Sequence, residues 1–146
     1  QEEVLKTKYR EAVQTNDYNW WQKDIQAVNA KIRNGPKNEA LIYKRVLGYL
    51  SLMMYIQTIE FMKQSNTSAA VYFDKLYLLV DPTNSEAHYL AAELNAMQGN
   101  QEGAINYLKS AVKNGYADKA RLQNDKAFEK IKTSANFHDV LKEIKQ

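Results

Sequence analysis

The chain has 146 residues, 45% of them apolar and 25% charged, which is the balance of one folded globular domain rather than of a disordered chain. It contains no cysteine, which excludes disulfide frameworks, thiolate metal sites and cysteine nucleophiles. The formal net charge of +3 comes from 20 basic and 17 acidic side chains, and this slight, interspersed excess predicts neither a nucleic-acid nor a membrane-surface partner.

Apolar residues recur at helical spacing from the N-terminus onward, and no run shows the alternation of a strand. The first stripe, residues 9–13, predicts a helix that ends near residue 16. A second helix is predicted over residues 18–34. We expect Gly35 to end it in the left-handed conformation, and Pro36 cannot continue it. The apolar stripe of this helix consists of Trp21, Ile25, Val28 and Ile32.

The next segment, residues 38–64, contains no helix breaker other than Gly48 and predicts one unusually long helix. Its most apolar part, residues 46–56, is too short to span a bilayer, which takes roughly 20 residues. We therefore predict no membrane span and expect this part to be buried on several sides within the fold.

Three further helical segments have clear end signals. One is predicted to begin after an N-cap in residues 65–68 and to end at residues 81–82. The other two run from residue 85 to residue 113 and are joined by a turn at residues 99–100, which is so short that they must lie antiparallel. Shorter helices after Gly115 are expected to close the end of this array.

A period of 34 residues relates the helices to one another, since it separates Ala70 from Ala104 and residues 81–82 from residues 115–116. Within residues 85–116, alanines stand where two helices of a hairpin must approach closely. These alanines are Ala92, Ala104 and Ala111. On these residues the segment resembles a tetratricopeptide repeat (TPR).

Two other parts of the chain resemble the same repeat less closely. Residues 51–82 keep Ala70 and the ending at residues 81–82 but carry Tyr77 where the family has alanine. Residues 17–38 resemble the second helix of a degenerate repeat. The resemblance implies an all-α, TPR-like fold of antiparallel helical hairpins, stacked as a short right-handed superhelix with C-terminal capping helices.

This implied fold is a single domain over residues 1–146. Its predicted parts are a degenerate repeat 1–36, a weak repeat 37–82, the best repeat 83–116 and capping helices 117–146.

The resemblance also implies a peptide-binding groove, because the first helix of each hairpin lines the concave surface of such arrays. The family's ligand-contact places hold Glu86, Tyr89, Glu93, Ala96 and Met97 in the best repeat, and Leu52, Tyr55, Ile59, Met62 and Lys63 in the weaker one. We expect a mixed apolar and acidic surface, and we expect alanine at Tyr89 or Glu93 to weaken binding with little change in the thermal midpoint. In the other interpretation, helices at either end of the array cover these side chains.

Adjacent tryptophans form a second candidate surface. Trp20 and Trp21 point about 100° apart on a helix, so both cannot face one core. Either Trp20 contacts a partner, as tryptophans often do in interfaces, or it covers the end of a neighbouring helix.

Sequence signatures of catalysis are missing. The two histidines, His88 and His138, belong to no metal-binding pattern, and the chain has no phosphate-binding loop or nucleophile elbow. We expect no catalytic residue, no cofactor and no metal, and predict a scaffold that binds a protein or peptide.

Two alternatives remain open from the sequence: a structural subunit that docks into a larger assembly through its helices, and an enzyme with a cleft between helices. The start at Gln1 rather than methionine is consistent with removal of an export signal to the periplasm or cell envelope. The oligomeric state and the compartment remain open.

Overall fold

The computed structural model describes residues 1–144, and within this range it contains eight α-helices, one short 3-10 helix and no strand. This confirms the predicted all-α class. In chain order the elements are α1 (Glu2–Ala12), α2 (Tyr18–Asn34), α3 (Lys37–Lys63), α4 (Thr67–Val80), α5 (Ser85–Met97), α6 (Gln101–Lys113), α7 (Lys119–Asn124), η1 (Lys126–Phe128) and α8 (Ala135–Glu143).

Short polar side chains begin most of these helices. Each accepts a hydrogen bond from a free backbone N–H in the first turn, which is the general role of an N-cap. The capping residues are Asp17, Asn66, Asn84, Asn100, Asp118 and Ser134. Gly99 and Gly115 follow the ends of α5 and α6 with φ angles of +81° and +102°, a region that glycine adopts without strain.

Gly35 ends α2 in a different way from the one expected. Its φ is −83° and its ψ 173°, so the backbone is extended rather than left-handed. A Cβ at this position would lie 2.6 Å from the carbonyl oxygen of Lys31. The close approach to the end of α2, rather than a positive φ, therefore accounts for glycine here.

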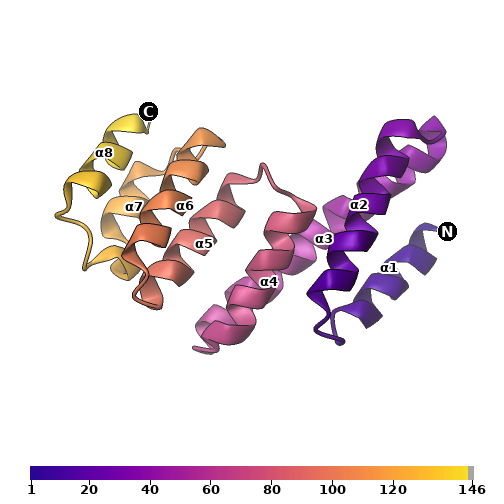
Figure 1. The fold of residues 1–146 in the computed structure, drawn as a ribbon, viewed down its shortest axis with the longest axis horizontal. Helices are drawn as coiled ribbons and strands as arrows, with labels where there is room; N and C mark the ends of the chain where they lie inside the picture. Colours follow the sequence, from indigo (N-terminus) through magenta and orange to yellow (C-terminus); the bar gives the residue numbers. More distant parts are fainter. Residues whose placement is uncertain (145–146) are drawn as a thin grey trace.

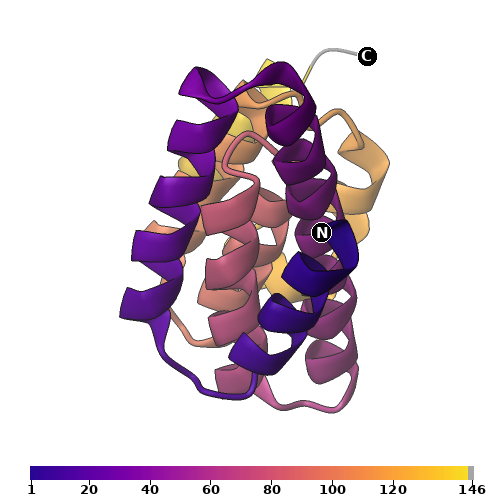
Figure 2. The ribbon, with the colours of Figure 1, turned by 90° about the vertical axis from the view of Figure 1, so that its right-hand side faces the viewer.

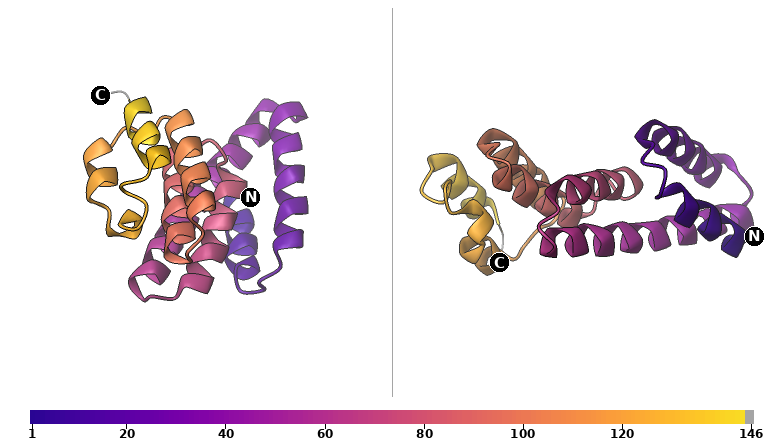
Figure 3. Two further views of the ribbon diagram at one scale, coloured as in Figure 1. Left: turned by 60° about the vertical axis from the view of Figure 1, so that its left-hand side comes forward. Right: turned by 90° about the horizontal axis from the view of Figure 1, so that it is seen from below.

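The helices lie side by side across the molecule in chain order, from α1 at one end to α8 at the other (Figure 1). Figure 2 looks along this row from the α1 end. The pairs α3–α4 and α5–α6 make the most extensive contacts, and α4 packs on α5. The long helix α3 reaches from α1 and α2 to α4 (Figure 3). The right-handed superhelix implied by the resemblance stays a prediction.

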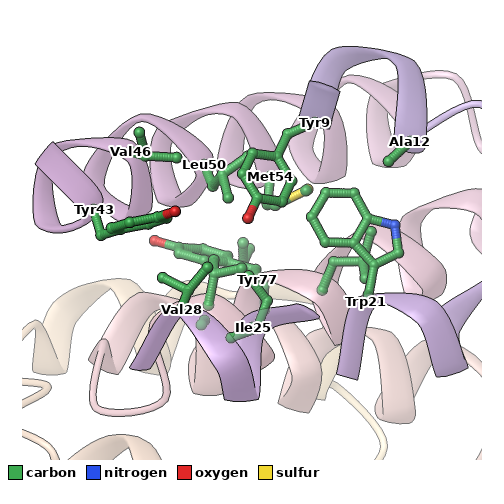
Figure 4. Close-up of a cluster of buried hydrophobic side chains, with 14 residues drawn as sticks. Tyr9, Ala12, Trp21, Ile25, Val28, Tyr43, Val46, Leu50, Met54 and Tyr77 are labelled. Carbon is green, nitrogen blue, oxygen red and sulfur yellow. The ribbon is translucent and has the colours of Figure 1, made fainter. Parts of the chain in front are cut away.

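Two groups of buried side chains form the core. In the first, Trp21 and Ile25 of α2 point toward Leu50 and Met54 of α3 (Figure 4). The second lies around Tyr89 and includes side chains of α6, η1 and α8. Helix α5 contributes to both groups from different faces and so joins the two halves of the row.

The prediction that residues 46–56 are buried on several sides is wrong for one face of α3. Val46 and Leu50 are fully buried, but Leu52 and Ile56 are 58% and 47% exposed. The reason is that α1, α2 and α4 pack on α3 and leave part of its apolar circumference uncovered. Within the described residues, no helix has the length and apolar character needed to cross a membrane.

Gly48 offers a first test of this open face. It lies inside α3, and a Cβ at this position would meet no atom within 4 Å. We expect Gly48→Ala to raise the free energy of unfolding by about 1 kcal/mol, because glycine loses more backbone entropy than alanine in a helix. Urea unfolding measures this change, and a decrease in stability would show that another part of the chain occupies the space beside Gly48.

Candidate binding surface

A hollow of about 470 Å³ lies where α3, the end of α4 and the start of α5 meet. We call it the α3–α5 hollow and define it by its lining residues, which are Gly48, Ser51, Leu52, Tyr55, Tyr77, Asn84 and Glu86. Its walls therefore combine exposed apolar groups of α3 with polar groups at the start of α5. A surface of this composition is suited to binding a ligand that is partly apolar and partly polar.

Hydrogen bonds hold the polar side of the α3–α5 hollow in place. The Ser51 hydroxyl donates to Asp81 Oδ2 over 2.7 Å, and the Asn84 side-chain amide donates to the same oxygen over 2.9 Å. The Tyr55 and Tyr77 rings meet edge to face with centroids 6.1 Å apart. These contacts tie α3 to the turn between α4 and α5, so the shape of the hollow is set before any ligand arrives.

A second, more apolar hollow of about 270 Å³ lies farther along α3. It is lined by Tyr49, Leu52, Met53, Ile56 and Gln57. Leu52 belongs to both hollows and so stands between them. The exposed apolar face of α3 is therefore continuous from the α3–α5 hollow to Ile56.

Glu86 connects the α3–α5 hollow to a polar cluster beneath α7. The Arg121 guanidinium donates to both carboxylate oxygens of Glu86, over 2.7 and 2.8 Å, in a bidentate pair. The same guanidinium lies 4.1 Å from the centroid of the Tyr89 ring. Tyr89 stacks on Tyr116 with centroids 4.5 Å apart, and its hydroxyl donates to Asp125 over 2.6 Å.

Glu93 belongs to the same cluster and lies 3.9 Å from the Arg121 guanidinium. Burial raises the pKa of its carboxyl well above the ordinary range, and the nearby Asp125 carboxyl raises it further, although Arg121 opposes the shift. The cluster therefore gathers three acidic side chains, Glu86, Glu93 and Asp125, around one guanidinium. This acidic excess borders the α3–α5 hollow where Glu86 lines it.

The structure brings only some of the predicted groove residues together at one open surface. Tyr55 and Glu86 line the α3–α5 hollow, but Tyr89 is fully buried and Glu93 lies beneath α7. Ile59 is half-buried farther along α3. For Tyr89 and Glu93 the structure fits the other interpretation, in which helices at the end of the array cover the groove side chains.

Met97 is 48% exposed at the end of α5 and lines neither of the two hollows. Sequence reasoning missed Gly48, Asn84 and Arg121. Gly48 was visible only as a possible helix breaker, and Asn84 only as a cap. Arg121 meets Glu86 across 35 residues of sequence, a pairing that helical periodicity does not indicate.

Trp20 packs on α1 in the structure. Its ring meets those of Tyr9 and Trp21 edge to face, with centroids 6.2 and 5.4 Å away, and the Lys8 ammonium lies 5.5 Å from its centroid. It is half-buried in this group. The arrangement matches the interpretation in which Trp20 covers a neighbouring helix end, while Trp21 is fully buried.

The bidentate pair predicts a measurable cost for losing Arg121. We expect Arg121→Gln to lower the free energy of unfolding by about 1 to 2 kcal/mol, because it leaves the Glu86 carboxylate without its cation. The loss stays modest because the site is partly exposed and water screens the charge. Urea unfolding at pH 7 measures the change. The matched control is Arg33→Gln, an exposed arginine on α2; an equal effect of both substitutions would contradict the role of the pair.

Within residues 1–144, no group of three or more His, Asp or Glu side chains is placed to hold a metal ion. Comparison of the chain with protein-family models, with curated proteins and with solved structures finds no match.

Proposed function

We propose that the chain is a non-catalytic, TPR-like module that binds a segment of a partner protein in the α3–α5 hollow. The observation that carries this proposal is the exposure of Leu52. This apolar side chain is 58% exposed on α3 and lines the same hollow as Glu86. Exposed apolar side chains that border a hollow with a few fixed polar groups are typical of binding surfaces.

The chemistry of the hollow indicates the kind of segment that fits. Leu52 and the two tyrosine rings offer contact for a large apolar side chain. The carboxylates of Glu86, which lines the hollow, and of Asp81, which accepts hydrogen bonds from two lining residues, outnumber the one guanidinium beside Glu86, so this edge favours a cation. We therefore infer a segment in which a lysine or arginine stands next to a large apolar residue.

The polar groups of the α3–α5 hollow support binding rather than turnover. Both oxygens of Glu86 already accept hydrogen bonds from Arg121, and the Ser51 hydroxyl donates to Asp81. General acid–base catalysis requires a group that is free to exchange a proton with the substrate. These pairings engage the lining groups with one another and favour a fixed recognition surface.

The test is affinity capture from the native cell with three versions of the chain. We expect the wild type to retain a recurrent partner, Leu52→Glu to lose it, and Val4→Glu to keep it. Val4 is the control because it is 70% exposed on α1, away from the hollow. The proposal fails if Leu52→Glu retains the partner as well as the wild type does.

A second candidate function is a structural subunit that docks through the outer face of α3. The observation in its favour is the second hollow and the exposure of Ile56 beyond the α3–α5 hollow. Ile56→Glu separates the two functions. It should abolish assembly if α3 docks by this face, and it should leave capture of a segment in the α3–α5 hollow largely intact.

A further inference from the structure

A separate hollow of about 190 Å³ lies between α4, α5 and α6. It shares no lining residue with the α3–α5 hollow. Val71, Leu78 and Leu94 give it apolar walls, and Tyr107 lies at its α6 side. Asp74 is the acidic residue that lines it.

One oxygen of the buried Asp74 carboxyl has no hydrogen-bond partner within residues 1–144. The Asp74 side chain is only 2% exposed, and its Oδ1 atom is buried without a hydrogen bond among the described residues. A buried polar atom in this state is rare, because leaving it unpaired costs free energy. Such an atom beside a hollow marks a place where a ligand can supply the missing partner.

The charged and titratable groups around Asp74 do not supply that partner. Burial, with a smaller contribution from the negative charge of Glu86 on α5, raises the pKa of Asp74 to about 8. Lys75 is at the rim, but its ammonium lies 3.9 Å from the centroid of the Tyr18 ring on α2. Tyr77 and Tyr107 supply no positive charge, so within residues 1–144 no cation pairs with Asp74.

We propose that this hollow binds a short alkylammonium group, with the ammonium on Asp74 and the carbon chain on Val71, Leu78 and Leu94. A cavity of roughly 150 Å³ holds a six-carbon ring, so a hollow of about 190 Å³ has room for a chain of comparable size. The paired cation offsets the cost of a buried carboxylate, and the apolar walls favour the carbon chain. A lysine side chain of another protein and a free alkylamine share this chemistry.

Binding of the ammonium displaces a proton. In the free protein Asp74 is protonated at neutral pH, and pairing with the ammonium ion requires the carboxylate, so one proton leaves to the solvent for each ligand bound. The apparent affinity therefore rises with pH up to about 8, where Asp74 loses its proton without a ligand. From pH 6 to pH 8 the expected gain is roughly 50-fold.

The test is calorimetric titration of the full chain with n-butylammonium chloride at pH 6 and pH 8, in two buffers of different ionisation heat. We expect saturable binding of one equivalent, release of nearly one proton at pH 6, and the gain in affinity with pH. Asp74→Asn should lose the binding, and Asp139→Asn should keep it because it removes an exposed carboxylate on α8. Neutral n-butanol should bind far more weakly than the ammonium ion.

A second probe, Nα-acetyl-lysine methylamide, separates the two sources of the ligand. Binding of both probes would show that the hollow accepts a lysine side chain of another protein, and binding of n-butylammonium alone would restrict it to a free amine. Absence of saturable binding of n-butylammonium at pH 8, or equal binding by Asp74→Asn, would overturn the proposal. These outcomes are independent of Leu52 and the α3–α5 hollow.

Discussion

Replacing Asp74 with asparagine is expected to raise the free energy of unfolding by roughly 3 to 4 kcal/mol at pH 7 and to change it little at pH 4. Burial, with a smaller contribution from Glu86, raises the pKa of Asp74 from its ordinary value of 3.8 to about 8. Between these values the folded chain holds a proton that the unfolded chain releases. The wild type therefore loses stability as pH rises from about 4 to about 8, and the asparagine variant lacks this loss.

Urea unfolding of both proteins at pH 4, 6 and 8 measures the effect. The difference between the two proteins is the informative quantity, since other carboxyls, such as Glu93, titrate equally in both. Asp139→Asn serves as the control and should reproduce the pH dependence of the wild type. The structure buries Asp74. If Asp74→Asn shows the same pH dependence as the wild type, this burial is wrong.

Tyr89→Ala is expected to lower the free energy of unfolding by about 3 to 5 kcal/mol, the range for truncating a large buried side chain. The ring is fully buried between Tyr116 and the Arg121 guanidinium, and its hydroxyl holds Asp125. This replaces the expectation, drawn from the resemblance, that the thermal midpoint changes little. The loss should also loosen α7 and η1, because Tyr89 ties both of them to α5.

Tyr89→Phe separates the ring from its hydroxyl. We expect it to cost about 1 to 2 kcal/mol, because the stacking stays and the hydrogen bond to Asp125 is lost. Thermal and urea unfolding compare the two variants, and hydrogen exchange of residues 119–128 reports the loosening. A midpoint of Tyr89→Ala equal to that of the wild type would show that the C-terminal helices do not cover this ring.

The helices were largely predictable because their signals are local. Asn66, Asn84 and Asn100 cap the helices that follow them, and the 3.6-residue spacing of apolar groups depends only on near neighbours. Gly35 shows the limit of such signals. Sequence indicates that the helix ends there, but the close approach to the Lys31 carbonyl depends on the backbone path in space.

The candidate site was predictable only in part. Tyr55, Leu52 and Glu86 occupy places that the family resemblance marks, and the structure puts all three at one hollow. The sequence left open whether the end helices cover Tyr89, because the cover depends on Arg121 meeting Glu86 from a distant helix. Asp74 gave no sequence signal either, since an acid on a helix is usually solvent-exposed and only packing between α4 and α5 buries it.

Gly48→Gln tests the proposed binding in the α3–α5 hollow most directly. The new side chain would enter the hollow from α3. Glutamine has a higher helix propensity than glycine, so the fold should be as stable as the wild type or more stable. The measurement is the dissociation constant for the partner captured on the wild type, together with the thermal midpoint. We predict binding weakened by roughly tenfold or more at an unchanged or higher midpoint; wild-type affinity in Gly48→Gln would contradict the account.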